Sequence, residues 1–581
     1  MTVDAAAQGR ADLAAWEAGK PANFFAADTN LQSVLRRTMG DAAYARAEAN
    51  LTRFGGQAAT ALDRWARDED LIGNHPRLDR YDGIGRRTEG IEFHPNHDRA
   101  GALIWASDIL ALQAKPGHTV EQMALFYLLS HNGEGGHCCS IACTAGLIRA
   151  LQTVGSEPLK ARFLAPLVDP NYDTMQHGAQ FLTEVQGGSD VGANALRATG
   201  HGDGTFRLTG EKWFCSNINA DQFLVMARPD GAPSGTRGLA VFVVPRLLDD
   251  GTTNSFFIRR LKDKLGTRTL ASAELDFDAA VAYPLGPLDH GFKTTVELVL
   301  NTSRLLNAVS CAGVMRRAAI EAASYAAHRT AFGQTIGSYP LVQEAIADCV
   351  SEYTAAVASG FALAALLDRI ETGRASEDEQ AVYRVLVNLN KYVTSVRGSH
   401  VVHRAIEVLG GNGAIESFSV LPRLYRDMVV LESWEGTHNV LCLQVQRDMQ
   451  RYGLHEPFLR WLGERLDAVT APALAHDRAV VALAVERGAD LLARIAALPV
   501  NAQQAHARRL ADVLTDCALA ALLLEEAQWE LDRGFATTKP QIAAYFINAH
   551  LRPGYDPLDD PDYLDRIRFV SEAALRDADP V

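Results

Sequence analysis

A change of hydrophobic period in the middle of the chain constrains the fold more than any other feature of the sequence. Between about residues 176 and 290, short runs of strand-forming residues alternate with clusters of Gly and Asp. These runs lie at residues 181–185, 206–208, 223–226, 239–244 and 256–258. Several short strands separated by turn signals predict a small β-barrel or β-sandwich.

Helical spacing of apolar residues is found on both sides of this block. Residues 38–67 show it before the block, whereas residues 74–97 bring Pro, Gly, Asp and Asn together and predict an ordered loop. Residues 303–328 show it after the block, dense in Ala, Leu and Val and free of proline. Ser376 and Glu379 have the spacing of a capping box and predict the start of another long helix.

The predicted fold is mainly α-helical with a middle β-domain. Several packed domains are expected, because 581 residues exceed what one compact core accommodates. We expect an N-terminal helical domain, the β-domain, a four-helix-type bundle and a further helical extension rich in Ala and Leu. Their expected bounds are 1–175, 176–290, 291–450 and 451–581. Residues 553–562, rich in Pro and Asp, predict a surface loop near the end of the extension.

Composition narrows the class of protein. Hydrophobic residues make up 48% of the chain and charged residues 22%, which is typical of a globular protein. Eight cysteines are too few for a disulfide scaffold and indicate reduced thiols, and Cys138, Cys139 and Cys143 are expected to pack on a helix rather than bind metal. Neither a secretory pattern nor an apolar run of membrane-spanning length is found, so a cytoplasmic protein is expected.

The charge balance bears on the class of partner. The formal net charge is −14, which disfavours nucleic acid because its backbone phosphates are also negative. The 451–581 extension holds fourteen Lys and Arg against twenty Asp and Glu. We therefore expect weak or no DNA binding by the extension.

Two motifs of possible chemical importance lie in the β-block. Residues 182–190 (LTEVQGGSD) leave a predicted strand and enter a turn whose backbone N–H groups and hydroxyls suit an anion. Residues 210–217 (GEKWFCSN) place flat aromatic side chains beside small polar donors, which suits the wall of a planar cofactor. A plain tight turn and a core aromatic are the simpler interpretations of each motif taken alone.

Three further motifs lie in the helical part that follows. Residues 329–333 (RTAFG) end a helix with an Arg and an aromatic, which suit a phosphate and an adenine. Residues 409–413 (LGGNG) follow a helix rather than a strand, so they are no dinucleotide fingerprint. In residues 434–439 (WEGTHN), an apolar setting would raise the pKa of Glu435 as a general base needs. A helix stop, an interhelical turn and a surface Glu are the simpler interpretations.

Taken together in this order and spacing, the five motifs resemble the acyl-CoA dehydrogenase family over about residues 75–450. Within that family the chain resembles the AidB-type branch, which also has a long helical C-terminal extension. The segments that carry this likeness are residues 80–87, 93–95, 260–266, 421–426 and 434–436. The resemblance implies a helical domain, a β-domain and a helical bundle, in the order of the predicted segments.

The resemblance also implies noncovalently bound FAD. The matching residues of the β-block are Leu182, Thr183, Gly188, Ser189, Phe214 and Ser216. Among them, Phe214 and Ser216 match the pair that flanks the isoalloxazine ring, and Ser189 also matches a position beside the CoA arm of the substrate.

Further cofactor contacts are implied for the helical part. Arg329 and Phe332 match residues that reach the FAD of a neighbouring subunit, which implies a homodimer or homotetramer. The remaining matching residues are Gly410, Gly411, Thr437 and Asn439.

Glu435 matches the catalytic base, which removes the α-proton of an acyl-CoA thioester while the β-hydride passes to flavin N5. Gly436 leaves the approach to this base open, and Arg304 matches an arginine near it. Trp434 is expected to contact the substrate and, with Phe214, to narrow or reshape its pocket. Some members carry the base just before this arginine, where Ser303 stands here, so Glu435 is the expected base.

The predicted function is FAD-dependent α,β-dehydrogenation of an acyl-CoA, with an electron-transfer flavoprotein as the acceptor. Two alternatives stay open: an acyl-CoA oxidase that uses dioxygen, and an AidB-like alkylation-response protein with residual dehydrogenase activity. No residue pattern specifies the acyl group. The extension is expected to cap the subunit or to fill a groove between subunits.

Overall fold

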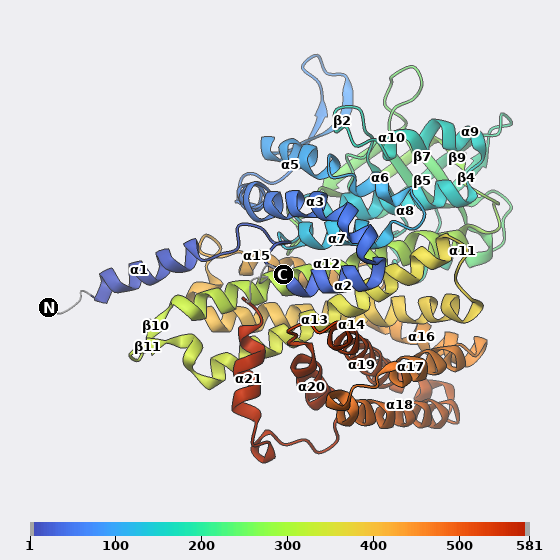
Figure 1. Cartoon of the computed structure of the whole chain (residues 1–581). Helices are drawn as coiled ribbons and strands as arrows, with labels where there is room; N and C mark the ends of the chain where they lie inside the picture. Colours follow the sequence, from blue (N-terminus) through green and yellow to red (C-terminus); the bar gives the residue numbers. More distant parts are fainter. Residues whose placement is uncertain (1–4, 576–581) are drawn as a thin grey trace.

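The computed structural model describes residues 5–575 and confirms a mainly α-helical chain with a middle β-domain (Figure 1). Figure 1 shows the β-domain at the upper right, a bundle of long helices across the centre and the orange and red C-terminal helices below it. The order along the chain is therefore helical, β, helical and helical, as the hydrophobic periods predict.

The N-terminal part is a layer of helices against the central bundle. The longer ones are α1 (Ala5–Ala18), α2 (Thr29–Met39), α3 (Asp41–Gln57), α4 (Asp63–Asp70), α5 (Pro95–Trp105), α6 (Ile109–Gln113), α7 (Thr119–Ser130) and α8 (Cys138–Val154). Two short helices, α9 (Glu157–Leu159) and α10 (Ala165–Leu167), lead into the β-domain. The residues of α7 are buried almost without exception, so this helix forms the centre of the layer.

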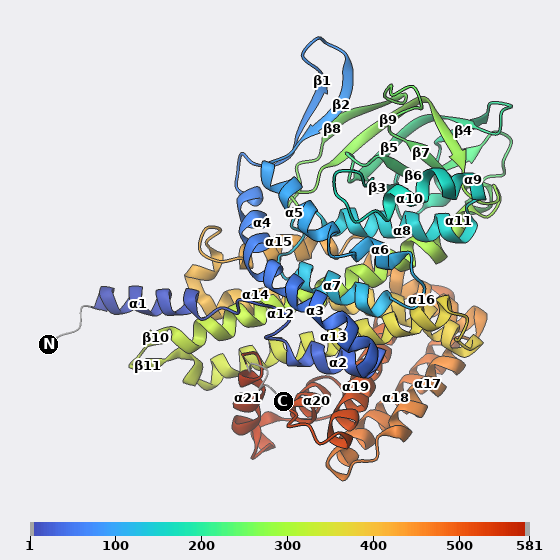
Figure 2. The same cartoon turned by 45° about the horizontal axis from the view of Figure 1, so that its top comes forward.

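Residues 74–97 contain a β-hairpin, so the prediction of a loop was wrong. The strands are β1 (Arg77–Tyr81) and β2 (Arg87–Glu92), which pair antiparallel. The carboxylate of Asp82 accepts the backbone N–H groups of Ile84 and Arg86 in the turn. The hairpin projects from the top of the molecule (Figure 2). Most of its side chains are exposed, so no alternation of apolar and polar residues marks the strands in the sequence.

The β-domain is a closed barrel with two attached strands. Its strands are β3 (Gly178–Phe181), β4 (Arg197–Gly200), β5 (Phe206–Ser216), β6 (Gln222–Pro229), β7 (Ala240–Pro245), β8 (Phe256–Leu261) and β9 (Ser272–Pro284). The ring closes because β4 pairs with β5, β5 with β9, β9 with β7, β7 with β6 and β6 with β4. The predicted runs fall in or beside β3, β5, β6, β7 and β8. The sequence prediction missed β4 and β9, because Gly, Thr, Ala and acidic residues dilute their apolar pattern.

Three long antiparallel helices form the central bundle. The elements of this part are α11 (Gly291–Thr294), α12 (Asn301–His328), β10 (Thr330–Ala331), β11 (Gln334–Thr335), α13 (Pro340–Glu371), α14 (Glu377–Leu409), α15 (Leu421–Leu431) and α16 (His438–Tyr452). The predicted capping box is confirmed at the start of α14: Glu379 N–H donates to Ser376 Oγ at 3.1 Å, and Ser376 N–H donates to Glu379 Oε2 at 2.9 Å.

Two helical stretches are long and apolar enough to span a bilayer by length and composition, although charged residues interrupt every window of that length, as the sequence predicts. They are Gly291–His328 and Pro340–Glu371, with mean hydropathies of 1.2 and 1.4 over their most apolar windows. These windows are 89% and 83% buried inside the protein. The apolar residues are therefore explained by packing in the core of the bundle.

The C-terminal extension is continuous with the bundle core. Its helices are α17 (His455–Ala468), α18 (Ala475–Ala496), α19 (Val500–Asp532), α20 (Lys539–His550) and α21 (Tyr563–Glu572). Helix α19 packs against α13, α14 and α16, and its residues 517–524 are fully buried. Arg397 of α14 pairs with both Glu352 of α13 and Asp516 of α19. Figure 2 shows these helices together beneath the bundle.

Candidate active site

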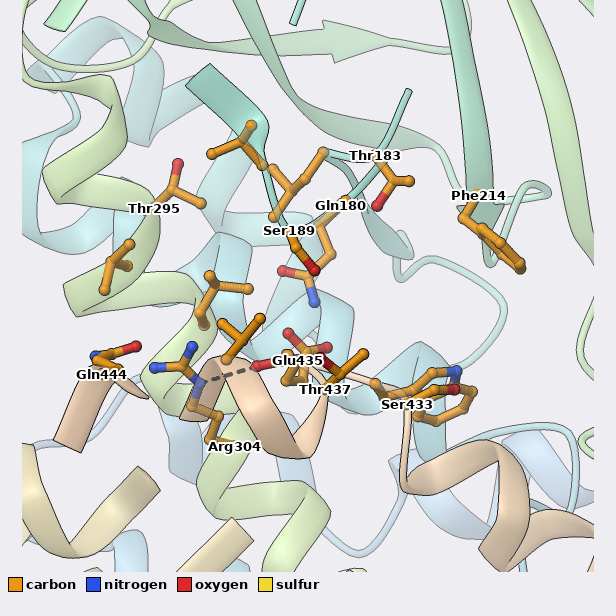
Figure 3. A pocket seen from close by; sticks show the side chains of 18 of the residues that line it. Gln180, Thr183, Ser189, Phe214, Thr295, Arg304, Ser433, Glu435, Thr437 and Gln444 are labelled. Carbon is orange, nitrogen blue, oxygen red and sulfur yellow. Dashed lines mark hydrogen bonds between the residues drawn. The ribbon is translucent and has the colours of Figure 1, made fainter. Parts of the chain in front are cut away.

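A cavity of about 1760 Å³ opens between the barrel and the bundle. Figure 3 shows Thr183, Ser189 and Phe214 on the barrel side, facing Arg304 and Glu435 on the helical side. Eleven of the predicted site residues line it, namely Leu182, Thr183, Gly188, Ser189, Phe214, Ser216, Arg304, Trp434, Glu435, Gly436 and Thr437. Segments more than 250 residues apart in the sequence therefore meet at one cavity.

Glu435 lies in the turn between α15 and α16, in an unusual backbone conformation. Its φ is 56°, in the left-handed region that non-glycine residues rarely adopt, and φ of Gly436 is 111°. Residues held in such conformations cluster at functional sites, which makes Glu435 a candidate functional residue. The turn presents the Glu435 carboxylate to the cavity, between the barrel wall and α12 (Figure 3).

The electrostatic setting of Glu435 suits a general base. Burial raises the pKa of Glu435 to about 7, and the positive charges of Arg304 and Lys391 oppose this shift. A base whose pKa lies near the working pH is deprotonated in a large fraction of the molecules. It still binds a proton strongly enough to remove one from a substrate. Desolvation thus gives this carboxylate a pKa in the range that such a base needs.

Arg304 holds the Glu435 turn through the backbone. Its Nε donates to the carbonyl oxygen of Glu435 at 3.0 Å, the dashed line in Figure 3. Its Nη1 donates to Asn388 Oδ1 at 2.8 Å and to Asn301 Oδ1 at 3.1 Å. Burial lowers the pKa of Arg304 to about 10, so the group stays charged at neutral pH. The guanidinium therefore both fixes the turn and lowers the pKa of the nearby carboxyl.

Lys391 is a second cation at this turn, and the sequence prediction missed it. Its Nζ donates to the carbonyl oxygens of Glu432 at 2.8 Å and Gly436 at 3.1 Å, so it holds the turn on both sides of Glu435. The side chain is fully buried, and burial lowers the pKa of Lys391 to about 8. The sequence offered one signal for this role, a lysine among residues 385–395 of α14, all of which are buried. A buried lysine needs a hydrogen-bond or ion-pair partner.

A buried ion pair supports the barrel wall of the cavity. Lys212 Nζ and Glu184 Oε1 lie 2.8 Å apart, and both side chains are almost inaccessible to solvent. Lys212 also donates to the carbonyl oxygen of Leu182. Glu184 accepts the backbone N–H groups of Ala195 and Leu196. This network fixes the turn after β3 that carries the predicted anion-binding residues.

One end of the cavity is apolar and contains thiols. Cys139 and Cys143, one turn apart on α8, pack with Leu270 and Trp434. Their sulfur atoms are 3.8 Å apart, and the hydrogen bond to Cys143, together with burial, raises the pKa of Cys139. All eight cysteines are buried free thiols.

The other end of the cavity is cationic. Arg384, Arg447 and Arg451 line it, together with the start of α19. Asp448 lies beneath two of them, accepting from Arg384 Nε at 2.8 Å and from Arg447 Nη2 at 3.0 Å. Glu297 also lies near Arg384, so three guanidinium groups face two carboxylates and this end carries a net positive charge.

Five of the predicted residues lie outside this cavity. Arg329, Gly410 and Gly411 line a second, shallower depression at the far end of the bundle. Phe332 lies nearby at the tip of the β10–β11 hairpin, with 97% of its surface exposed. Asn439 instead accepts a hydrogen bond from Arg508 Nη2 of the extension at 2.8 Å.

Comparisons with known proteins agree with this architecture. Family models match residues 17–174 (adaptive response protein AidB, N-terminal domain), 179–280 (acyl-CoA dehydrogenase, middle domain) and 289–450 (acyl-CoA dehydrogenase, C-terminal domain). The putative acyl-CoA dehydrogenase AidB of Escherichia coli is 35% identical over 396 residues, which cover 65% of this chain and 70% of that protein. The chain belongs to the AidB-type branch of the acyl-CoA dehydrogenase family.

Other relatives extend the likeness to the whole fold. Acyl-CoA dehydrogenase family member 11 of Caenorhabditis elegans is 31% identical over 433 residues, which cover 72% of this chain and 69% of that protein. The crystal structure of C. elegans ACDH-11 in complex with C11-CoA aligns with a TM-score of 0.84 at 27% identity. This alignment covers 93% of each chain, so it continues into the extension beyond the residues that the family models match.

The protein is thus an oxidoreductase of a family whose cofactor is FAD, and the cavity fits this group. Phe214 has 49% of its surface exposed on the cavity wall, next to the Ser216 hydroxyl. An aromatic surface beside a hydroxyl suits the flavin, whose flat ring system has polar edges. Within residues 5–575, Gln180 Oε1 is a buried acceptor at the cavity without a hydrogen-bond partner. A bound polar ligand would satisfy it.

Proposed function

We propose that this protein catalyses the α,β-dehydrogenation of an acyl-CoA thioester, with Glu435 as the base. The observation that carries the proposal is the placement of the Glu435 carboxylate, whose pKa burial raises to about 7, in a cavity facing Phe214 and Ser189 (Figure 3). A thioester α-hydrogen is a weak acid, so its removal needs a well-placed base and a stabilised carbonyl oxygen.

The residues of this turn have different roles in the removal of the proton. The Glu435 carboxylate takes the α-proton, and the Glu435 backbone N–H donates a hydrogen bond to the thioester oxygen. Arg304 and Lys391 hold the carbonyl groups of this turn, so the carboxylate and the N–H keep a fixed separation. Gly436 has no side chain to obstruct the approach of the substrate. FAD, when bound, supplies the acceptor for the hydride that leaves the β-carbon.

The two ends of the cavity define the orientation of the substrate. The acyl group points toward the apolar end at Cys139, Cys143 and Trp434. The phosphates of CoA bind the cationic end at Arg384 and Arg447. The C11-CoA complex of the C. elegans relative supports a CoA thioester as the ligand.

Removal of one arginine tests this orientation. Arg447→Met should raise the KM for an acyl-CoA about tenfold, since one charge-assisted contact to phosphate is lost. The same variant should leave the KM for the matching acyl-pantetheine, which lacks the nucleotide phosphates, unchanged. Equal losses for both thioesters would show that Arg447 acts on the fold rather than on CoA.

Anaerobic titration with a panel of acyl-CoA thioesters tests the reaction itself. The visible absorbance of bound FAD should bleach on addition of a substrate, and the enoyl-CoA product should appear in equal amount. Protein that contains FAD but is bleached by no acyl-CoA of the panel would contradict the proposed reaction.

An electron-transfer flavoprotein is the proposed electron acceptor, with dioxygen as the alternative. Both acceptors follow the same proton removal at Glu435, so the cavity does not distinguish them. Stoichiometric hydrogen peroxide during aerobic turnover would identify an oxidase. Turnover that needs an added electron-transfer flavoprotein and forms no peroxide would identify a dehydrogenase.

We also propose that the protein works as a homodimer or homotetramer. The exposed Phe332 and the nearby depression at Arg329 and Gly410 form a surface that a second copy can cover. Phe332→Ser should reduce the mass measured by light scattering after size exclusion, and an unchanged mass would place the interface elsewhere.

A further inference from the structure

We propose that Lys264 is a positioning residue that orients the hydroxyl of Ser216 toward the flavin through Ser272. This inference rests on the proposed function, because it takes the cavity wall at Ser216 as the flavin face. Lys264 lies in the segment between β8 and β9, and Ser216 and Ser272 face each other on β5 and β9.

A line of three hydrogen-bonding groups joins these residues. Lys264 Nζ donates to Ser272 Oγ at 3.0 Å and to the carbonyl oxygen of Leu270 at 2.8 Å. Ser272 Oγ and Ser216 Oγ are 3.0 Å apart. All three side chains line the cavity, and Ser272 has only 2% of its surface exposed.

The chemistry of the three groups determines which of them donates and which accepts in each hydrogen bond. An ammonium group only donates, so Ser272 Oγ must accept from Lys264. Within residues 5–575, the Ser272 hydroxyl has one other partner, the oxygen of Ser216. A buried hydroxyl proton without an acceptor is costly, so Ser272 donates to Ser216. The proton of Ser216 is then left to point into the cavity.

The positive charge at the start of the line strengthens each following bond. A donor whose own oxygen accepts a bond is more polarised, and this cooperativity is greatest in a low-dielectric setting. Burial lowers the pKa of Lys264 to about 8, against the opposing effect of the nearby Glu134, Cys139 and Asp427, so the ammonium form predominates at neutral pH. Ser216 therefore acts as a polarised donor, which stabilises the electron-rich reduced cofactor more than the oxidised one.

The adjacent Lys262 offers a matched control for charge alone. Its Nζ lies 3.7 Å from the ring centroid of Trp213 and 4.6 Å from that of Phe214, and it pairs with Glu274 at 3.0 Å. Its backbone N–H donates to the carbonyl oxygen of Ser272 at 2.8 Å, but within residues 5–575 its side chain has no hydrogen bond to Ser272 or Ser216. A general effect of positive charge near the flavin should therefore appear with either lysine, whereas the hydroxyl line involves Lys264 only.

The test is the reduction equilibrium of protein-bound FAD against a reference dye. Ser272→Ala and Lys264→Met should each shift it about tenfold toward oxidised flavin, the factor for one hydrogen bond near a charge. The double variant should shift it no further than either single variant, because both changes break the same line. Ser272→Thr, which keeps the hydroxyl, should restore the wild-type equilibrium, and Lys262→Met should shift it less.

The outcomes separate the two proposals. A shift in Lys264→Met without one in Ser272→Ala would overturn the hydroxyl line and leave a plain charge effect. If Lys264→Met does not fold, Ser272→Ala and Ser272→Thr decide by themselves, since neither changes a charge. Wild-type protein that binds FAD and is bleached by acyl-CoA, with no shift in any variant, overturns this inference alone. Wild-type protein that takes up no FAD would overturn the proposed function. The inference about Lys264 would then fail as well, because the flavin is the acceptor of the Ser216 proton.

Discussion

Arg304 contacts Glu435 through the backbone: its Nε donates to the Glu435 carbonyl oxygen at 3.0 Å. The guanidinium therefore fixes the turn, and within residues 5–575 the carboxylate has no direct ion pair. A carboxylate in such a pair would be a weaker base, because an opposite charge in contact lowers its pKa. The arrangement combines a rigid turn with a base whose pKa lies near neutrality.

The first prediction concerns pH. Flavin reduction by acyl-CoA requires deprotonated Glu435, so its rate should rise with pH through a midpoint near 7. Lys391→Met removes a charge that lowers the pKa of Glu435, so the midpoint should move up by about one pH unit. Stopped-flow absorbance across pH 5.5–9 measures this, with Lys160→Met, which does not line the cavity, as the control. The same midpoint in all three proteins would mean that Lys391 does not act on Glu435.

The second prediction concerns stability. The pKa of Glu435 is raised to about 7 in the folded protein, against 4.5 as the usual value. The resulting stabilisation is complete below pH 4.5 and is lost as pH rises through 7. Glu435→Gln stays neutral, so its gain in unfolding free energy over wild type should grow by up to about 3 kcal/mol from pH 4.5 to pH 8. Urea unfolding of the FAD-free proteins measures it, and a difference independent of pH would contradict the raised pKa.

Gly436 supplies a third prediction. Its φ is 111°, and a Cβ there would lie 3.3 Å from Leu441 Cδ2, so Gly436→Ala should destabilise the fold by about 1–3 kcal/mol. Gly463 of α17 is the matched control, since an added Cβ meets nothing within 4 Å and the backbone is helical. Gly463→Ala should stabilise by about 0.5–1 kcal/mol. Equal effects of the two variants in chemical unfolding would contradict a strained turn.

The extension gives a fourth prediction. Leu522 of α19 is fully buried among the helices, so Leu522→Ala should cost about 2–5 kcal/mol of stability to the whole protein. Leu558 is 93% exposed, and Leu558→Ala should change stability by less than about 0.5 kcal/mol. Unfolding should remain a single transition, with the same midpoint for a probe in the bundle and a probe in the barrel. Separate loss of the extension, with the cavity intact, would show that α19 is not part of the core.

The order of the domains was predictable because each period of apolar residues extends over a whole element. Helix α12 is dense in Ala, Leu and Val, strand β7 is a continuous apolar run, and Ser376 carries its own capping signal. The β1–β2 hairpin was not predictable, since its exposed strands bury too little to impose a pattern. Closure of the barrel depends on pairings such as β4 with β6, which no local signal specifies.

The candidate site was predictable to the extent that it lies in short motifs. Glu435 and Gly436 are adjacent in the chain, and the same turn carries both. Lys391 and Lys264 were missed because their roles depend on contacts with segments distant in sequence or with a facing strand. A buried lysine is visible in a sequence only as an interruption of an apolar face, and its partner is visible only in the fold.

The most direct test of the central claim is the anaerobic reaction of Glu435→Gln with a thioester that bleaches the wild-type protein. The variant should bind FAD and acyl-CoA as the wild type does, because the amide has nearly the same shape. Its rate of flavin reduction should be at least about a hundredfold lower, since the base is lost. Bleaching of the variant at the wild-type rate would contradict the assignment of Glu435 as the base.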